Sequence, residues 1–110
     1  MITENLLKAD ISISTSGDNT IITAPSGTSE YIVIDHINMV PNSAVTVQLK
    51  DGSTNYGGAY SLTANQGWVL ENSIQNQNGI ITLSVNSAFV INLSSAVQVS
   101  GFVRYRIINR

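Results

Sequence analysis

The stretch Phe89–Ile108, F-V-I-N-L-S-S-A-V-Q-V-S-G-F-V-R-Y-R-I-I, decides the fold class of this chain. Alternate side chains share one face of a β-strand, so a two-residue period of apolar residues predicts strands. Here that period runs through two sets of residues on either side of Ser94-Ser95, namely Phe89, Ile91 and Leu93, and then Val97, Val99, Val103, Tyr105 and Ile107. Gly101 interrupts the second run and predicts a bend, where the strand bulges or another backbone approaches closely.

The opposite face of that second run is polar apart from one aromatic ring. It carries Gln98, Ser100, Phe102, Arg104 and Arg106. The two arginines either form a solvated strand face or pair with carboxylates of a neighbouring chain, because the arginine fork suits partly buried interfaces. We therefore take Phe102, Arg104 and Arg106 as the candidate oligomer interface.

The rest of the chain repeats the strand pattern between turn signals. Tyr31–Met39 is apolar on both phases at its start, which predicts a central strand that is covered on both faces. Asp51-Gly52 predicts a tight hairpin turn, Asn86-Ser87 a two-residue connection, and Gly57-Gly58 weakens its strand enough to place it at an edge. Further strands are expected over 9–14, 20–24, 44–50, 55–62, 68–70, 80–85 and 88–93. The pattern predicts an all-β fold, an antiparallel β-sandwich or jelly roll of eight or nine strands.

The first eight residues differ from the remainder of the chain. Met1–Lys8, M-I-T-E-N-L-L-K, lacks the two-residue period and is the one place where a helical turn is plausible, although eight residues are too few to hold a helix alone. We expect an N-terminal arm over 1–8 and a single β-sandwich domain over 9–110. The arm either frays or docks Ile2, Leu6 and Leu7 on a neighbouring protein.

Composition limits the class of protein. The 110 residues suffice for one domain with a modest core. Only 11% of residues are charged, against about 25% in an ordinary soluble domain, and the net charge is −2, so little charge opposes self-association. There is no cysteine, no apolar run near the ~20 residues of a membrane span, and no signal-peptide pattern. We expect no membrane association.

The sequence offers no recognisable catalytic or metal-binding constellation. His36 is the only histidine, and its neighbour Asp35 should point to the opposite face of a strand unless a bulge intervenes, so a structural role is favoured. The acids are dispersed, and Asp51 with Asn55 lacks the rest of a calcium loop. We expect no enzyme activity, no cofactor and no metal site.

The basic and aromatic residues bear on two binding functions, nucleic-acid binding and carbohydrate binding. Five basic residues against seven acidic ones supply no field for phosphates, so nucleic acid is disfavoured. A carbohydrate-binding module is the alternative function, because Trp68, Tyr56 and Tyr60 offer rings for stacking. The two tyrosines, four residues apart in a predicted strand, would share a face.

Three motifs resemble a pattern of small virion proteins of tailed bacteriophages. They are A-V-T-V-Q-L-K-D-G-S-T at Ala44–Thr54, L-T-A-N-Q-G-W-V-L at Leu62–Leu70 and N-L-S-S-A-V-Q-V-S-G-F-V-R-Y at Asn92–Tyr105. The similarity covers roughly residues 32–105 and consists of strand and turn patterns, so the N-terminal arm lies outside it.

The resemblance implies a head decoration (cement) protein, a β-sandwich that is usually an oligomer. Such a protein would be made in the host cytoplasm and would bridge major capsid protein subunits on the outer capsid surface. A homotrimer is the favoured oligomer, because a closed ring hides edge strands. Ile2, Leu6 and Leu7 are then the candidate capsid-binding residues.

Overall fold

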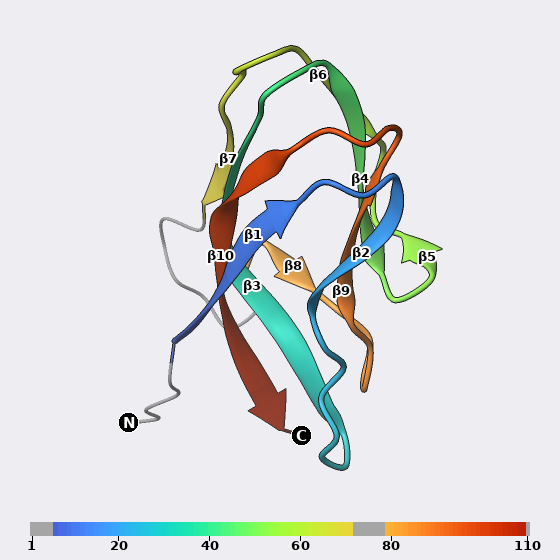
Figure 1. The fold of residues 1–110 in the computed structure, drawn as a ribbon. Coiled ribbons are helices and arrows are strands. Elements are labelled where there is room, and N and C mark those ends of the chain that lie inside the picture. Colours follow the sequence, from blue (N-terminus) through green and yellow to red (C-terminus); the bar gives the residue numbers. More distant parts are fainter. Residues whose placement is uncertain (1–5, 72–78, 110) are drawn as a thin grey trace.

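The computed structural model describes residues 6–71 and 79–109, and within these it contains ten strands and no helix (Figure 1). The strands are β1 (Leu7–Ile13), β2 (Gly17–Ile22), β3 (Glu30–Pro41), β4 (Val45–Asp51), β5 (Thr54–Asn55), β6 (Tyr60–Leu62), β7 (Trp68–Glu71), β8 (Ile81–Thr82), β9 (Phe89–Leu93) and β10 (Val99–Asn109). The all-β class expected from the two-residue period is confirmed.

The strands form two antiparallel sheets that pack together as a sandwich (Figure 1). The first sheet has the order β1-β10-β3-β7, and β8 also pairs with β3. The second sheet has the order β2-β9-β4-β5, and β6 also pairs with β4. Consecutive strands often belong to different sheets, so much of the chain crosses from one layer to the other.

The core lies between the two sheets and is built from the apolar phase of each strand. Phe89, Ile91 and Leu93 of β9 are buried, as their spacing predicts, and they face Val99 and Val103 of β10 across the sandwich. Val97, Tyr105 and Ile107 pack against the same core and are partly buried. Both halves of the C-terminal stretch thus line one interior from opposite sheets.

β3 is the central strand that its sequence predicts. Tyr31, Ile32, Val33 and Ile34 are all buried, and Ile32 and Ile34 belong to the core between the sheets. The other two point to the opposite face of the first sheet, where they are buried as well. Burial on both faces explains why the strand is apolar on both phases.

Gly101 marks a close approach of two backbones, as its position predicts. A Cβ atom at Gly101 would collide with the backbone carbonyl oxygen of Asn38 on β3. β10 nevertheless continues through this residue without a break, so the glycine lies within the strand. The register shift between β10 and β3 falls three residues later, between Arg104 and Tyr105.

Two details of the expected strand pattern are wrong. The strand predicted over 55–62 is divided into β5 and β6, which is why the described residues hold ten strands; both pair with β4, at the predicted edge of the second sheet. The predicted two-residue connection at Asn86-Ser87 is instead a corner between sheets, since β8 pairs in the first and β9 in the second. The Asn86 side-chain amide holds that corner by donating to the carbonyls of Pro25 and Gly27.

The boundary between the expected N-terminal arm and the β-sandwich lies at residue 7 and not at residue 9. β1 begins at Leu7, which lies opposite Tyr105 of β10, and Lys8 lies opposite Arg104. These two residues therefore belong to the first sheet and not to an arm, because β10 supplies the backbone hydrogen bonds that such a short segment cannot make by itself. Ile2 lies outside the described residues.

The turn between β4 and β5 is a tight hairpin, shifted by one residue from its prediction. Asp51 pairs with Thr54, so Gly52 and Ser53 are the two central residues. Gly52 has a φ of 63°, the conformation that a glycine at the first central position of a type II′ turn supplies. The Gly52 N–H donates to the Ala88 carbonyl, 2.8 Å away, which ties the turn to the approach to β9.

We expect Gly52→Val to lower the free energy of unfolding by about 1 kcal/mol or more, because a β-branched residue resists positive φ. Its Cβ would also lie 2.8 Å from the Ser87 Oγ. Chemical denaturation measures the loss. Gly58→Val is the matched control, since a Cβ at Gly58 meets nothing within 4 Å and its φ is not positive. Equal stability of the two variants would contradict the turn assignment.

Candidate interaction surface

The outer face of the first sheet is the surface turned away from the core, and on it three rows of side chains cross the strands. Ala9, Ile11 and Ile13 of β1 pack on the core, so the residues between them point outward. Cross-strand pairing places the side chains in the rows Lys8–Arg104–His36–Glu71, Asp10–Phe102–Asn38–Val69 and Ser12–Ser100–Val40.

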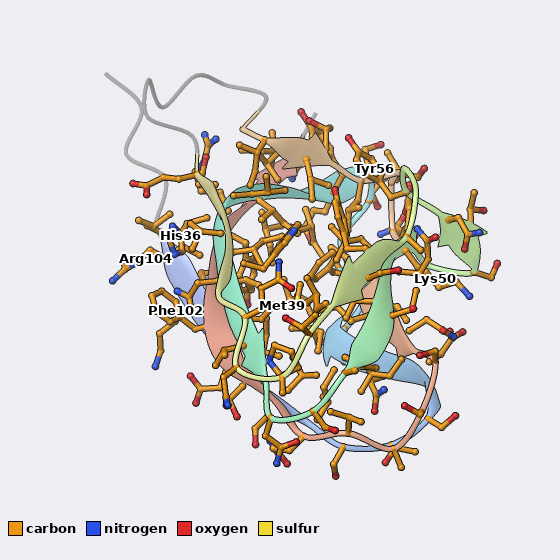
Figure 2. All side chains as sticks on the ribbon, turned by 90° about the horizontal axis from the view of Figure 1, so that it is seen from above. His36, Met39, Lys50, Tyr56, Phe102 and Arg104 are labelled. Carbon is orange, nitrogen blue, oxygen red and sulfur yellow. The ribbon has the colours of Figure 1, made fainter. Side chains whose placement is uncertain are left out.

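The middle of this face is a contact cluster on β3 and β10. The His36 and Phe102 rings stack with their centroids 5.2 Å apart, and the Arg104 guanidinium carbon lies 5.9 Å from the centre of the Phe102 ring. The Asn38 amide nitrogen lies 2.9 Å from His36 Nε2, and Glu71 Oε1 lies 3.7 Å from His36 Nδ1. Figure 2 shows His36, Phe102 and Arg104 together, away from the sandwich interior where Met39 lies.

His36 Nε2 thus lies at hydrogen-bond distance from the Asn38 amide, whereas Glu71 stands 3.7 Å from Nδ1, too far for a hydrogen bond. This agrees with the structural role expected for the only histidine. It also means that the ring is held in one orientation, which gives Phe102 a fixed stacking partner.

Two exposed valines extend the cluster toward the edge of the sheet. Val69 on β7 is 58% exposed and Val40 on β3 is 39% exposed, both high values for aliphatic side chains on a sheet face. With the Phe102 ring they form an apolar strip among polar and charged neighbours. Aromatic rings, arginine and apolar groups inside a polar rim are the composition of protein–protein contacts.

Arg106 does not belong to this exposed cluster, which corrects its place in the predicted interface. Its Nε donates to Asp35 Oδ2 at 2.7 Å and its Nη2 donates to Asp35 Oδ1 at 2.9 Å. The side chains are only 15% and 7% exposed, respectively. The carboxylate partner expected from a neighbouring chain is in fact supplied by the same chain.

A β-bulge makes this pairing possible. Arg104 lies opposite His36, but the next residue, Tyr105, lies opposite Ile34, so the register passes over Asp35. The extra residue lets Asp35 and His36 both turn to the outer face, whereas consecutive strand residues otherwise alternate. The bulge therefore brings Asp35 to Arg106, and His36 keeps its separate partners.

The outer face of the second sheet has its own charged network. The Lys50 ammonium donates to both carboxylate oxygens of Asp18, at 3.1 and 3.0 Å, and the Asn92 amide donates to Asp18 Oδ1 at 2.7 Å. The Asn92 hydrogen bond and then the Lys50 hydrogen bond and charge hold the pKa of Asp18 below its ordinary value of 3.8. Each charge on this network has an intramolecular partner.

Two leucines are exposed at the start of β1. Leu6 is 43% exposed and Leu7 is 37% exposed, near the N-terminal end of the first sheet. They are the described members of the predicted capsid-binding set, which also contains Ile2. Leu7 lies on the phase of Ala9 and Ile11, and Leu6 precedes the strand; we call this exposed N-terminal end of β1 the apolar edge.

The aromatic residues considered for glycan stacking are arranged differently from their prediction. The Tyr60 and Trp68 rings pack on each other, with centroids 4.8 Å apart and planes at 57°, and both rings are partly buried against the core. Tyr56 lies outside the strands, beside Gly57 with its φ of 73°, so it shares no strand face with Tyr60. The three rings do not form one exposed platform.

The described residues contain no group of three or more histidine, cysteine or carboxylate side chains placed to hold a metal ion. Asp51, which the sequence assigns to a turn and not to a calcium loop, accepts hydrogen bonds at Oδ2 from the Ser84 backbone N–H at 3.0 Å and from the Ser84 hydroxyl at 2.8 Å. Asp51 therefore joins the β4 end to the corner before β9.

No protein-family model, curated protein or solved structure matches the chain. Within residues 6–71 and 79–109 the structure has no helix that could cross a bilayer.

Sequence reasoning identified Phe102 and Arg104 but missed the neighbours that complete the cluster. Asn38, Glu71 and Lys8 enter it through cross-strand pairing, which no local pattern reveals. One signal was available for the buried ion pair: Asp35 stands in an otherwise apolar run, and a buried carboxylate requires a cationic partner.

Asp35→Ala should lower the free energy of unfolding by about 3–5 kcal/mol, because it leaves the Arg106 charge buried without this carboxylate. Asp10→Ala is the matched control. It removes the exposed ion pair with Lys8, which contributes about 0–1 kcal/mol. Urea denaturation measures both values. Similar losses in the two variants would show that the Asp35–Arg106 pair contributes no more to the free energy of unfolding than the exposed Lys8–Asp10 pair.

We expect Asp18→Asn to lower the melting temperature at pH 7, and the difference from the unchanged chain to disappear in acid. The folded-state pKa of Asp18 is depressed, so its stabilisation is present above the unfolded pKa and is lost as the pH falls through the lower folded value. Thermal melts of both chains between pH 7 and pH 2 measure this. A difference that stays constant over the whole range would rule out a charge-dependent contribution.

Proposed function

We propose that this protein is a non-enzymatic structural component of a tailed-bacteriophage virion, which decorates the outer capsid surface by bridging major capsid protein subunits. The proposal rests on the resemblance carried by Ala44–Thr54, Leu62–Leu70 and Asn92–Tyr105. In the structure these motifs cover β4, the last residue of β6 with most of β7, and the last two residues of β9 with the first seven of β10. They therefore belong to both sheets of the sandwich.

The observation that carries the proposal is the pair of separate contact surfaces. One is the outer face of the first sheet, where Phe102, Val40 and Val69 lie among charged residues. The other is the apolar edge at Leu6 and Leu7. A protein that bridges subunits needs at least two such surfaces, because each must contact a different neighbour.

The edge at the start of β1 is the proposed capsid-binding surface. Burying a leucine contributes about 1.5–3 kcal/mol of transfer free energy, less what is lost when the segment becomes ordered. Lys8 and Asp10 follow immediately on the outward phase of β1, so a polar rim adjoins the apolar contact. Apolar contacts inside polar rims are typical of specific interfaces.

A carbohydrate-binding module is the less supported alternative. The Tyr60 and Trp68 rings pack on each other at a tilt and are partly buried against the core, so they do not present a pair of open ring faces to a sugar. Tyr56 alone among the three candidates is exposed by about a third of its surface.

Leu6→Ser combined with Leu7→Ser should weaken binding to undecorated phage heads by at least about tenfold, because both exposed side chains lose their apolar contact. Co-sedimentation of the purified chain with such heads measures the affinity. Val85→Ser is the matched control, since Val85 is equally exposed but belongs to the corner between β8 and β9.

Failure of the unchanged chain to bind heads would refute the decoration role. Binding that the double leucine variant retains in full would refute the edge as its site. Saturable binding to a glycan array, lost in Tyr56→Ala, would favour the carbohydrate-binding alternative.

A further inference from the structure

The row Lys8–Arg104–His36–Glu71 places two positive charges of one chain next to each other. Lys8 lies directly opposite Arg104 in the pairing of β1 with β10, and like charges in that position are destabilising. Lys8 forms an exposed ion pair with Asp10 at 3.0 Å. Among the described residues, however, Arg104 has no carboxylate partner and contacts only the Phe102 ring. The first sheet therefore exposes a cation that its own face does not neutralise.

The two sheets differ in how the cations on their outer faces are placed relative to carboxylates. On the second sheet Lys50, the exposed-face cation, is held by both oxygens of Asp18 and is only 14% exposed. On the first sheet the carboxylate of Glu71 stands at the far end of the row, on β7, three strands away from Lys8. The row is cationic at its β1 end and acidic at its β7 end.

We propose that two copies of this chain pack the outer faces of their first sheets against each other about a two-fold axis parallel to the strands. Such a rotation exchanges the positions of β1 and β7 and of β10 and β3. It places Lys8 of one copy over Glu71 of the other, and Arg104 over His36, whose Nδ1 lies beside Glu71. Lys8 of each copy then gains Glu71 of the other as an opposite charge, so one member of the like-charge pair Lys8 and Arg104 is neutralised from across the interface.

The apolar strip fits the same arrangement. Phe102 and Asn38 occupy the middle of the second row, so the rotation places each Phe102 ring over Asn38 of the other copy, close to the axis, while Val69 at the end of the row lies over Asp10. Face-to-face sheets with nearly aligned strands are a common packing. Phe102 and Arg104, the oligomer-interface residues expected from the sequence, are both used, whereas Arg106 is not.

The area of the face is that of a weak contact. β1, β10 and β3 run side by side for about 24 Å at a spacing of about 4.8 Å, whereas the four residues of β7 span about 14 Å, so the face covers roughly 400 Å² on each copy, or roughly 800 Å² for two copies. That is below the roughly 1,000 Å² of a stable specific interface, so we expect a dimer that dissociates at low concentration and weakens with salt. This inference does not depend on the proposed capsid role, and it proposes a dimer in place of the homotrimer favoured by the sequence. In the dimer the second copy takes the outer face of the first sheet, so bridging of capsid subunits would fall to the two apolar edges at Leu6 and Leu7, one on each copy.

The test is the molar mass in solution, measured by light scattering and sedimentation equilibrium over a range of micromolar concentrations. The unchanged chain should reach twice the 11.8 kDa of one copy. Lys8→Glu and Glu71→Lys should each raise the dimer dissociation constant by about tenfold, because each makes two attractive pairs repulsive. The double variant Lys8→Glu/Glu71→Lys should restore the dimer.

The variants separate loss of the interface from loss of the fold. Lys8→Glu loses the exposed ion pair with Asp10 but replaces the like-charge pair with Arg104 by an attractive one, so its melting temperature should change little. Ser61→Glu, on the exposed phase of β6 in the second sheet, is the control and should leave the dimer unchanged. A monomer at all concentrations, an assembly of three chains, or failure of the double variant to re-form the dimer would each overturn the proposal.

Discussion

The antiparallel pairing of β3 with β10 is the interaction on which the other features depend. It joins Glu30–Pro41 to Val99–Asn109 through eleven cross-strand pairs in the middle of the first sheet. It determines which side chains face the core, where the bulge falls and which residues form the outer rows. Because the two strands are about 70 residues apart, this pairing pays a large loop-closure entropy, which core burial on both sides must exceed.

The outer faces of the two sheets differ in whether their cations are paired with carboxylates of the same chain. Within the part of the chain that the structure describes, the outer face of the first sheet carries an arginine without such a partner, and this makes it the candidate contact surface. The bulge at Asp35 lets this carboxylate form a largely buried ion pair with Arg106, so Arg106 is not an exposed cation. Lys50 is neutralised by Asp18 on the second sheet. Arg104 is left exposed on Phe102, and in a chain with so few charged residues such an arginine stands out.

Several parts of the fold were predictable because their physical cause is local. Double-sided apolarity identified Tyr31–Ile34 as central, and the glycine at position 101 identified the close approach to Asn38. The candidate surface was only half predictable. Phe102 and Arg104 follow from the alternation of one strand, but Lys8, Asn38 and Glu71 join them from three other segments.

The sequence alone determined that the chain forms an antiparallel sandwich and which phase of each long strand is apolar, because a two-residue period is a property of consecutive side chains. Tertiary structure decided that Asn86 turns a corner between sheets, that Leu7 belongs to β1, and that Arg106 pairs with Asp35. Each of these depends on which distant strand lies alongside and in which register. Register is set by the packing of whole sheets, and one inserted residue, Asp35, reverses the direction of the side chains that follow.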